Sequence, residues 1–260
     1  MRILVLADIH GNWPALRAIV ERERFDVCLC AGDLVDYLTD PAPCMKWFAE
    51  NVQYAVRGNH DHAVAQRILP SSLHGFRKLA YITRPINWKA LNTLQLKLLG
   101  RLPTTQQINV DGLSTYMVHA TPKDSMDEYL GPDAEAWTKR MEGISANLAI
   151  VGHTHMPFVL DLGHMTILNP GSVGQPRDGN PDAAYAIIED GKIELHRVSY
   201  PIDETLQQMR DVGIPAWAID ITATVLRTGG QVTKDEMLKY GPNDISEIET
   251  TIFAPLEPET

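Results

Sequence analysis

The segment RILVLADIHGNWPALRAIVERE, residues 2–23, indicates the fold. Its first part is an apolar run typical of a buried β-strand, and this run ends abruptly at Asp8. Its second part places Asn12 as a helix N-cap and Pro14 in the first turn, and then repeats apolar residues on one helical face. A strand that leads directly into a helix is typical of the β-α-β unit.

The same alternation of strand and helix patterns continues to residue 61. The apolar segments DVCLCAGD (26–33) and VQYAVRGNHD (52–61) flank the helix-like segment PAPCMKWFAEN (41–51). This order is typical of an α/β protein with a largely parallel sheet. Residues 62–102 then have a helical pattern with turn signals, and we expect them to form an excursion over the sheet.

The second half of the chain has a different pattern. Three segments contain paired apolar runs joined by Asp-Gly or Gly, which is typical of β-hairpins and predicts a second sheet. These segments are QQINVDGLSTYMVHA (106–120), FVLDLGHMTILNPGS (158–172) and AAYAIIEDGKIELHRV (183–198). We therefore expect one domain over residues 1–200. Residues 201–260 are expected to form a C-terminal helical extension with an acidic tail that is disordered at its end.

Composition limits the location and the partners. The formal net charge of −10 argues against broad binding to nucleic acid or anionic membranes, because both need clustered Lys and Arg. No apolar run reaches the roughly 18 to 20 residues of a membrane-spanning helix, and the N-terminus has no signal-peptide pattern. A cytoplasmic location is therefore expected. Cys28 and Cys30 lie in an apolar run and are expected to be buried thiols, not a zinc clip.

Polar residues follow five of the apolar runs, at the point where each run ends. Ligands of open α/β sheets bind beyond the carboxyl ends of the strands, so we expect these segments to converge on one site. Asp, Asn and His bind divalent metals of the Mn, Fe, Co, Ni or Zn kind, and the donors are numerous enough for two ions. The residues are Asp8, His10, Asp33, Asn59, His60, His119, His153 and His155.

Each segment taken alone also has an ordinary structural explanation. Asp-x-His and Gly-Asp are common in turns at strand ends, and GNHD is compatible with an Asn-rich turn. GHTH is compatible with one core histidine beside one solvated histidine. The functional interpretation depends on all five segments occurring together, in order, and each at a strand end.

Together the five segments resemble the calcineurin-like metallophosphoesterases. That family's pattern is Asp-x-His, Gly-Asp, Gly-Asn-His-Asp or Glu, a single His, and Gly-His-x-His. The matching segments are DIH (8–10), GD (32–33), GNHD (58–61), His119 and GHTH (152–155). The resemblance covers roughly the first 200 residues. The segment LNPGSVGQPRDG (168–179) is similar to the bacterial and archaeal branch that contains small phosphodiesterases and relatives of diadenosine tetraphosphatase.

The resemblance implies a two-layer β-sandwich flanked by α-helices, the four-layer fold of this family, with a dinuclear metal site in residues 1–200. One divalent ion would be held by Asp8, His10, Asp33 and His155. The other would be held by Asp33, Asn59, His119 and His153, so that Asp33 bridges the two. Manganese is the expected metal, with iron, nickel, cobalt or zinc as alternatives. His60 would act as general acid, with Asp61 orienting its ring.

Other positions keep two interpretations. Arg57 is either a clamp for a phosphate oxygen or a solvated residue at a strand end. The loop 169–172 either lines the pocket or is a plain turn, and Asn12 fits a helix cap better than a substrate contact. The remaining histidines are expected to be structural or surface residues; they are His62, His74, His164 and His196.

The implied activity is hydrolysis of small organic phosphodiesters or phosphomonoesters by a hydroxide that two metal ions activate. Dinucleoside polyphosphates and phosphoproteins are alternative substrates of the same chemistry, and the acidic charge argues against a nuclease. A non-catalytic protein-binding scaffold of the same fold is the alternative from another class, although every proposed ligand position is filled. The expected partner is a small phosphorylated substrate, and the sequence leaves the oligomeric state open.

Overall fold

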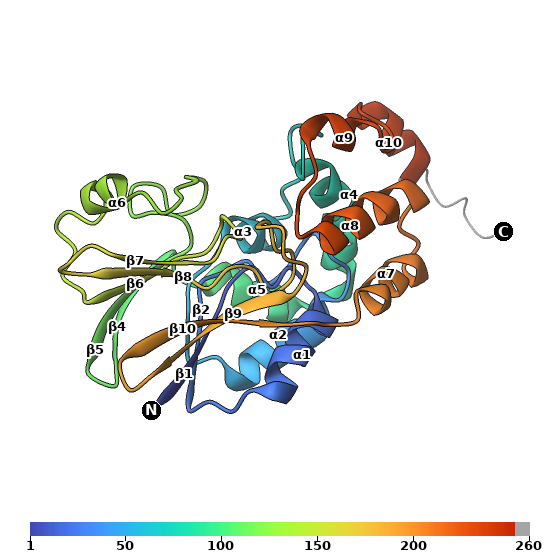
Figure 1. Ribbon diagram of the computed structural model, residues 1–260. Coiled ribbons are helices and arrows are strands. Elements are labelled where there is room, and N and C mark those ends of the chain that lie inside the picture. The colour runs from blue at the N-terminus through green and yellow to red at the C-terminus, as the bar shows by residue number, and fades with distance from the viewer. Residues whose placement is uncertain (253–260) are drawn as a thin grey trace.

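The computed structural model describes residues 1–252, and two five-stranded sheets form its centre (Figure 1). The first sheet has the order β10-β9-β1-β2-β3. Its strands are β1 (Arg2–Leu6), β2 (Val27–Cys30), β3 (Tyr54–Ala55), β9 (Ala183–Glu189) and β10 (Lys192–Val198). The first three are parallel to one another, whereas β9 pairs antiparallel with both β1 and β10.

The second sheet has the order β4-β5-β6-β8-β7. Its strands are β4 (Thr105–Val110), β5 (Leu113–Val118), β6 (Leu148–Ile150), β7 (Phe158–Asp161) and β8 (Thr166–Asn169). β5, β6 and β8 are parallel, and hairpins form both edges of the sheet.

The prediction that the second half of the chain builds the second sheet is correct for two of the three hairpins. The third hairpin, β9–β10, belongs to the first sheet. Every residue of β9 except Glu189 is buried, so this strand needs cover on both faces. A place beside β1, between the two layers that enclose the sheet, provides that cover.

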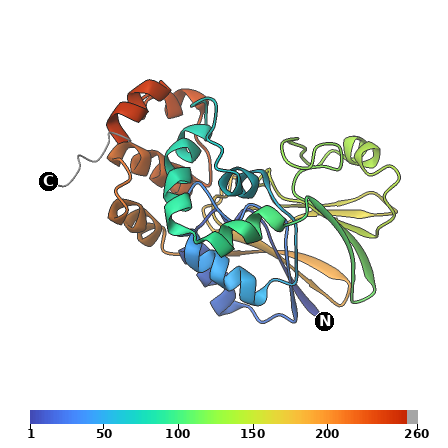
Figure 2. The same cartoon turned by 180° about the vertical axis from the view of Figure 1, so that it is seen from behind.

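Alternating side chains of the central strands separate two hydrophobic layers. Leu4 of β1 packs in the cluster that includes α1 (Trp13–Arg22), α2 (Pro41–Asn51) and α5 (Thr93–Arg101), and these helices cover the first sheet (Figure 2). Val5, its neighbour, packs between the sheets with Ile150 of β6. On the far side, Trp137 of α6 (Ala134–Arg140) packs against the second sheet. These layers confirm the expected α/β fold of two sheets flanked by helices.

Most of the remaining helices pack around a separate hydrophobic cluster beside the first sheet (Figure 1). Leu79 of the excursion and Met209 and Val225 of the C-terminal region belong to this cluster. The helices of this cluster are α4 (Arg77–Ala90), α7 (Ile202–Asp211), α8 (Ala216–Thr228), α9 (Lys234–Leu238) and α10 (Ile245–Ile252). The short helix α3 (Asn59–Ala65), which follows β3, instead packs Val64 into the cluster that covers the first sheet. The excursion and the C-terminal extension therefore pack on each other. The predicted disorder at the C-terminus falls largely outside the described residues.

Several smaller predictions are confirmed. Asn12 caps α1, because its side-chain oxygen accepts a hydrogen bond from the Ala15 amide at 3.3 Å. Cys28 and Cys30 are buried free thiols. Among the helices of residues 1–252, none combines the length and the apolar character needed to cross a bilayer.

Candidate metal centre and active-site pocket

Side chains from four loops meet beyond the carboxyl ends of strands in both sheets. They form two buried groups, and within each group the donor atoms lie within 4.8 Å of one another. The groups are Asp8, His10 and His155, and Asp33, His119 and His153. Asp33 Oδ2 lies between them, 3.9 Å from His10 Nε2 and 3.2 Å from His119 Nε2. The structure therefore brings together residues that lie up to 147 positions apart in the sequence, as the motifs predict.

A left-handed backbone conformation at five residues directs their side chains into the site. φ is 54° at Asp8, 53° at His10, 57° at Asp33, 66° at His153 and 59° at His155. Residues with a β-carbon seldom adopt this conformation, and each instance costs on the order of 1 to 3 kcal/mol. Such strain persists only where the surrounding structure enforces it, and it is typical of functional sites.

The glycines of the motifs let the loops approach one another. A β-carbon on Gly58 would lie 2.0 Å from Asp33 Oδ1, closer than any real contact. A β-carbon on Gly32, whose φ is 96°, would lie 2.7 Å from the Gly58 nitrogen. Both positions therefore exclude a side chain, which explains the glycine that precedes Asp33 and the glycine that precedes Asn59.

Backbone carbonyls orient the imidazoles. His119 Nδ1 lies 2.7 Å from the Ala31 oxygen and His155 Nδ1 lies 2.6 Å from the Gln175 oxygen. Because a carbonyl only accepts, Nδ1 carries the proton in both rings and Nε2 presents its lone pair to the site. His10 Nδ1 has a longer contact of 3.3 Å with the Val35 oxygen.

The donor atoms fit a pair of cations. Within residues 1–252, four buried atoms of the site have no hydrogen-bond partner: Asp33 Oδ2, Asn59 Oδ1, His119 Nε2 and His153 Nε2. In addition, His10 Nε2 faces His155 Nε2 at 3.1 Å. Buried polar atoms are normally satisfied, and two facing lone pairs repel, so both observations favour positive charge at these positions. Asn59 and His153 also line the same cavity.

The electrostatics of the metal-free site agree with this interpretation. Burial raises the pKa of Asp8 to about 8 and lowers the pKa of His153 to about 3. Burial alone would lower the pKa of His119, but the charge of Asp33, whose Oδ2 lies 3.2 Å from Nε2, raises this pKa to about 10. A neutral imidazole is the ligand form of histidine, so a metal at His119 has to displace a proton.

His60 has a different partner from the predicted one. Its Nδ1 lies 2.7 Å from Asp36 Oδ2, whose second close contact is Arg84 Nε at 2.8 Å. Burial would raise the pKa of Asp36, but Arg84 and the hydrogen bond from His60 lower it to about 2. Asp36 is therefore an anion, and His60 donates Nδ1–H to it. Asp36 was not indicated by the motifs; its only signal is its place three residues after Asp33.

The prediction that Asp61 orients His60 is therefore wrong. The Asp61 carboxylate accepts hydrogen bonds from the backbone nitrogens of Asp33 and Leu34, both at 2.8 Å, and of Gly58 at 3.1 Å. The Gly58 amide is the N-cap amide of α3, which a helix N-terminus leaves free, whereas the other two amides belong to the loop after β2. Asp61 thus fixes the Asp33 loop and does not touch the imidazole of His60.

Arg57 does not reach the site either. Its Nη1 donates to the Gly100 oxygen at 2.8 Å, near the C-terminal end of α5. The last carbonyls of a helix have no intrahelical partner and attract cations, which explains this orientation. The clamp interpretation of Arg57 is therefore not supported.

A cavity of about 750 Å³ opens beside the two groups of donor atoms, called the metal groups below. Asn59, His60 and His153 line it on the metal side. The other walls come from the excursion and from distant loops, and they include Tyr37, His62, His74, Phe76, Arg84, Tyr129 and Arg177. His62 and His74 thus border the cavity, and Arg177 supplies the arginine that Arg57 does not. Its signal in the sequence is its place in the segment GQPRDG.

The loop 169–172 supports the ligands from behind. Asn169 Nδ2 donates to the Gly152 oxygen at 2.8 Å, and Ser172 Oγ donates to the Asp8 oxygen at 2.7 Å. Both side chains are buried and neither lines the cavity. Of the two interpretations, the structural turn is the correct one.

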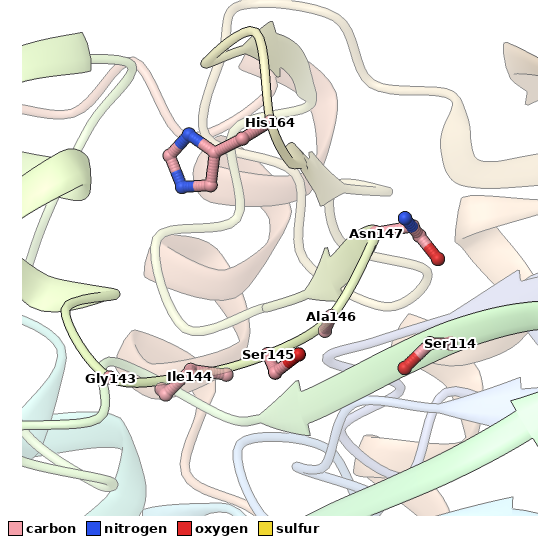
Figure 3. Close-up of a pocket in the computed structure, with 7 residues that line it drawn as sticks. All are labelled: Ser114, Gly143, Ile144, Ser145, Ala146, Asn147 and His164. Carbon is pink, nitrogen blue, oxygen red and sulfur yellow. The ribbon is translucent and has the colours of Figure 1, made fainter.

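A second cavity, of about 490 Å³, lies at the opposite ends of the strands (Figure 3). It is lined by Ser114, His164 and residues 143–147, which precede or begin β5 and β6. Its lining has one imidazole and no carboxylate or thiol. It therefore offers no cluster for metal binding or acid–base chemistry.

Comparison with known proteins agrees with the five motifs. The model of the calcineurin-like phosphoesterase superfamily domain matches residues 1–191. An uncharacterised protein of Methanocaldococcus jannaschii is 33% identical over 236 residues, which cover 83% of this chain and 94% of that protein. The phosphodiesterase YfcE of Escherichia coli is 24% identical over 209 residues, which cover 75% of this chain and 91% of YfcE. A metallophosphoesterase structure from Sphaerobacter thermophilus has a TM-score of 0.74 and 31% identity, over 88% of this chain and 99% of that one.

Proposed function

Because the chain belongs to the calcineurin-like phosphoesterase superfamily, we propose that it hydrolyses small organic phosphate esters with two divalent metal ions. The observation that carries this proposal is the pair of buried donor groups with Asp33 Oδ2 between them. Two ions bound there supply Lewis-acid activation of water and of the phosphate ester. The first would be held by Asp8, His10, His155 and Asp33, and the second by Asp33, Asn59, His119 and His153. The mixed oxygen and nitrogen donors favour manganese or a similar transition metal.

His60 is proposed as the general acid. Its Nδ1 is engaged by Asp36, so its Nε2 is the nitrogen available to a ligand in the cavity that His60 lines. The proton on Nε2 of a protonated His60 would pass to the oxygen of the leaving alcohol as the ester bond breaks. Asp36 holds the ring through its Nδ1–H, and Arg84 fixes Asp36 from the other side.

The walls of the cavity favour a small substrate. The excursion contributes Phe76 and Arg84, and Tyr129 comes from the loop that follows β5. A cavity of about 750 Å³ holds a ligand of nucleotide size, but its walls restrict the approach of a folded phosphoprotein. We therefore propose small phosphodiesters as the preferred substrates, followed by phosphomonoesters and dinucleoside polyphosphates. The name of the relative YfcE, a phosphodiesterase, agrees with this order.

Metal analysis with an activity panel tests the proposal. The purified protein is stripped with a chelator, reloaded with Mn²⁺, Co²⁺, Ni²⁺, Zn²⁺ or Mg²⁺, and assayed on phosphomonoesters, phosphodiesters, a dinucleoside tetraphosphate and a phosphoprotein. We expect loss of activity on stripping, recovery with a transition metal, and the highest kcat/KM on a small diester. Full activity without metal would contradict the metal-dependent mechanism. Tight metal binding without hydrolysis of any ester would favour the non-catalytic scaffold.

A further inference from the structure

Arg177 presents a cation to the cavity beside the metal groups. Its side chain is half-buried and lines the cavity together with Asn59 and His153. Its backbone nitrogen donates to the His155 oxygen at 3.3 Å, so the residue is anchored directly to a metal-ligand loop. No role for this residue follows from the five motifs.

The guanidinium is held without being neutralised. Its Cζ lies 4.1 Å from the centroid of the Phe76 ring and 5.7 Å from that of Tyr37. Nη2 donates to Gln175 Oε1 at 2.9 Å, and the side chain also hydrogen-bonds to Tyr37 and Tyr129. The adjacent carboxylate, Asp178, pairs with Arg197 instead. Aromatic stacking thus fixes the orientation of a cation whose charge remains available to an anion.

One guanidinium nitrogen also lacks a partner. Within residues 1–252, Arg177 Nε is buried without a hydrogen-bond acceptor. A buried donor in this state is costly unless a ligand satisfies it. A phosphate oxygen is the acceptor that the planar guanidinium fork matches best, and the adjacent donor groups are those proposed to hold the metals that bind the same phosphate.

The C-terminal extension fixes the backbone that carries Arg177. Gly229 ends α8 in the left-handed conformation, and its oxygen accepts a hydrogen bond from the Gly179 nitrogen at 2.9 Å. A β-carbon on Gly230 would lie 2.7 Å from Arg177 Cα, so the two backbones are in direct contact. Gly229 and Gly230 both lie beyond residues 1–191, which the family model covers.

We propose that Arg177 binds a non-bridging oxygen of the substrate's phosphate group, and that the C-terminal extension builds this contact by fixing residues 176–180. The proposal rests on the proposed phosphoesterase function, because the phosphate must lie against the metal groups. On this proposal, the donor groups form one part of the substrate site, and segments outside the five motifs build the part that contains Arg177. Those segments are the excursion, through Phe76, and the end of α8.

Inorganic phosphate and a simple diester test the proposal on the Mn²⁺-loaded full chain. The variants are Arg177→Met, Arg177→Lys and, as a matched control, Arg101→Met, which removes an exposed arginine at the end of α5. Phosphate affinity is measured by calorimetry, and bound metal is measured by mass spectrometry. The kinetic constants kcat and KM are measured with bis(4-nitrophenyl) phosphate as substrate. We expect Arg177→Met to weaken phosphate binding and to lower kcat/KM by roughly 10- to 100-fold, with unchanged metal content.

Arg177→Lys keeps the charge but loses the forked contact and the stacking, so we expect an intermediate loss of about fivefold or more. This variant carries the test if Arg177→Met does not fold. Phosphate affinity within twofold of the Arg101→Met control, or a loss of bound metal, would overturn the proposal. A wild type that does not bind phosphate would overturn it as well. A wild type that binds phosphate through Arg177 but hydrolyses no ester would leave this binding site in place and contradict only the proposed function.

Discussion

His60 and Asp36 form a buried pair in which the imidazole Nδ1 lies 2.7 Å from a carboxylate oxygen. The same oxygen accepts a hydrogen bond from Arg84 on α4 at 2.8 Å, and Thr83 donates to the other oxygen at 3.1 Å. The orientation of His60 is therefore fixed through Asp36 by Thr83 and Arg84 of the helical excursion, which contributes none of the proposed metal ligands. Acid catalysis and metal binding can consequently be tested separately.

Replacing His60 should affect poor leaving groups most. We expect His60→Asn to slow hydrolysis of alkyl phosphodiesters by about 10² to 10⁴, the usual contribution of general acid catalysis. Nitrophenyl diesters need little protonation of the leaving oxygen and should lose much less. The measurement is kcat on both substrates with metal content determined in parallel, and His164→Asn, at an exposed position, is the control. An equal loss on both substrates would show that His60 has another role.

Asp36→Asn should lower both stability and activity. The variant leaves the buried Arg84 without its anionic partner, so we expect the free energy of unfolding to fall by on the order of 3 kcal/mol. It also removes the anionic acceptor that orients the His60 ring, so kcat on alkyl diesters should fall while bound metal stays constant. Denaturant unfolding and metal analysis measure these effects. Wild-type activity on alkyl diesters would contradict the assigned partnership of Asp36 and His60.

Asp33→Asn should remove metal and activity together. Its carboxylate lies between the two donor groups, and an amide supplies one neutral oxygen in place of two anionic ones. We expect bound metal to fall, turnover to be lost and the circular-dichroism spectrum to remain native. Asp190→Asn, in the turn between β9 and β10, is the matched control. Unchanged turnover in Asp33→Asn would exclude a bridging role for this residue.

Glu23 gives a prediction for pH dependence away from the site. Its Oε1 accepts a hydrogen bond from the Tyr185 hydroxyl at 2.6 Å, and its Oε2 lies 2.7 Å from Arg2. Burial would raise the pKa of Glu23, but Tyr185 and Arg2 lower it below its usual 4.5. A carboxyl with a lowered pKa stabilises the fold above its usual pKa, and this contribution is lost as the pH falls through the lowered value.

We therefore expect Glu23→Gln to lower the free energy of unfolding by about 1 to 2 kcal/mol at pH 7. The difference from wild type should shrink below about pH 4, where the unfolded and then the folded carboxyl take up protons. Thermal unfolding between pH 3 and pH 7 measures it, with the exposed Glu21→Gln as control. A difference that grows as the pH falls would contradict the assignment.

The meeting of the two donor groups could be predicted from the sequence because each residue follows an apolar strand run, and the carboxyl ends of such strands meet at one edge. Asp8, Asp33 and His119 need only this local rule. Asp36 and Arg177 could not be predicted in the same way. The role of Asp36 depends on where α4 places Arg84, and the role of Arg177 depends on where α4 and α8 place Phe76 and Gly230. These placements follow from side-chain packing between distant helices, which leaves no short-range pattern. The β9–β10 hairpin was misassigned for the same reason, since a hairpin motif does not specify which sheet it joins.

Because Gly230 contacts the backbone of Arg177, the proposed phosphate contact and the proposed metal site depend on different parts of the chain. The proposed metal ligands lie in loops of the two sheets, whereas the proposed phosphate-binding arginine is held by the end of α8, which follows them in the chain. Exchanging the C-terminal helices between relatives would thus retune substrate choice without rebuilding the reaction centre. For protein engineering, residues 201–252 are the part of this chain to randomise when a new phosphate ester is the target.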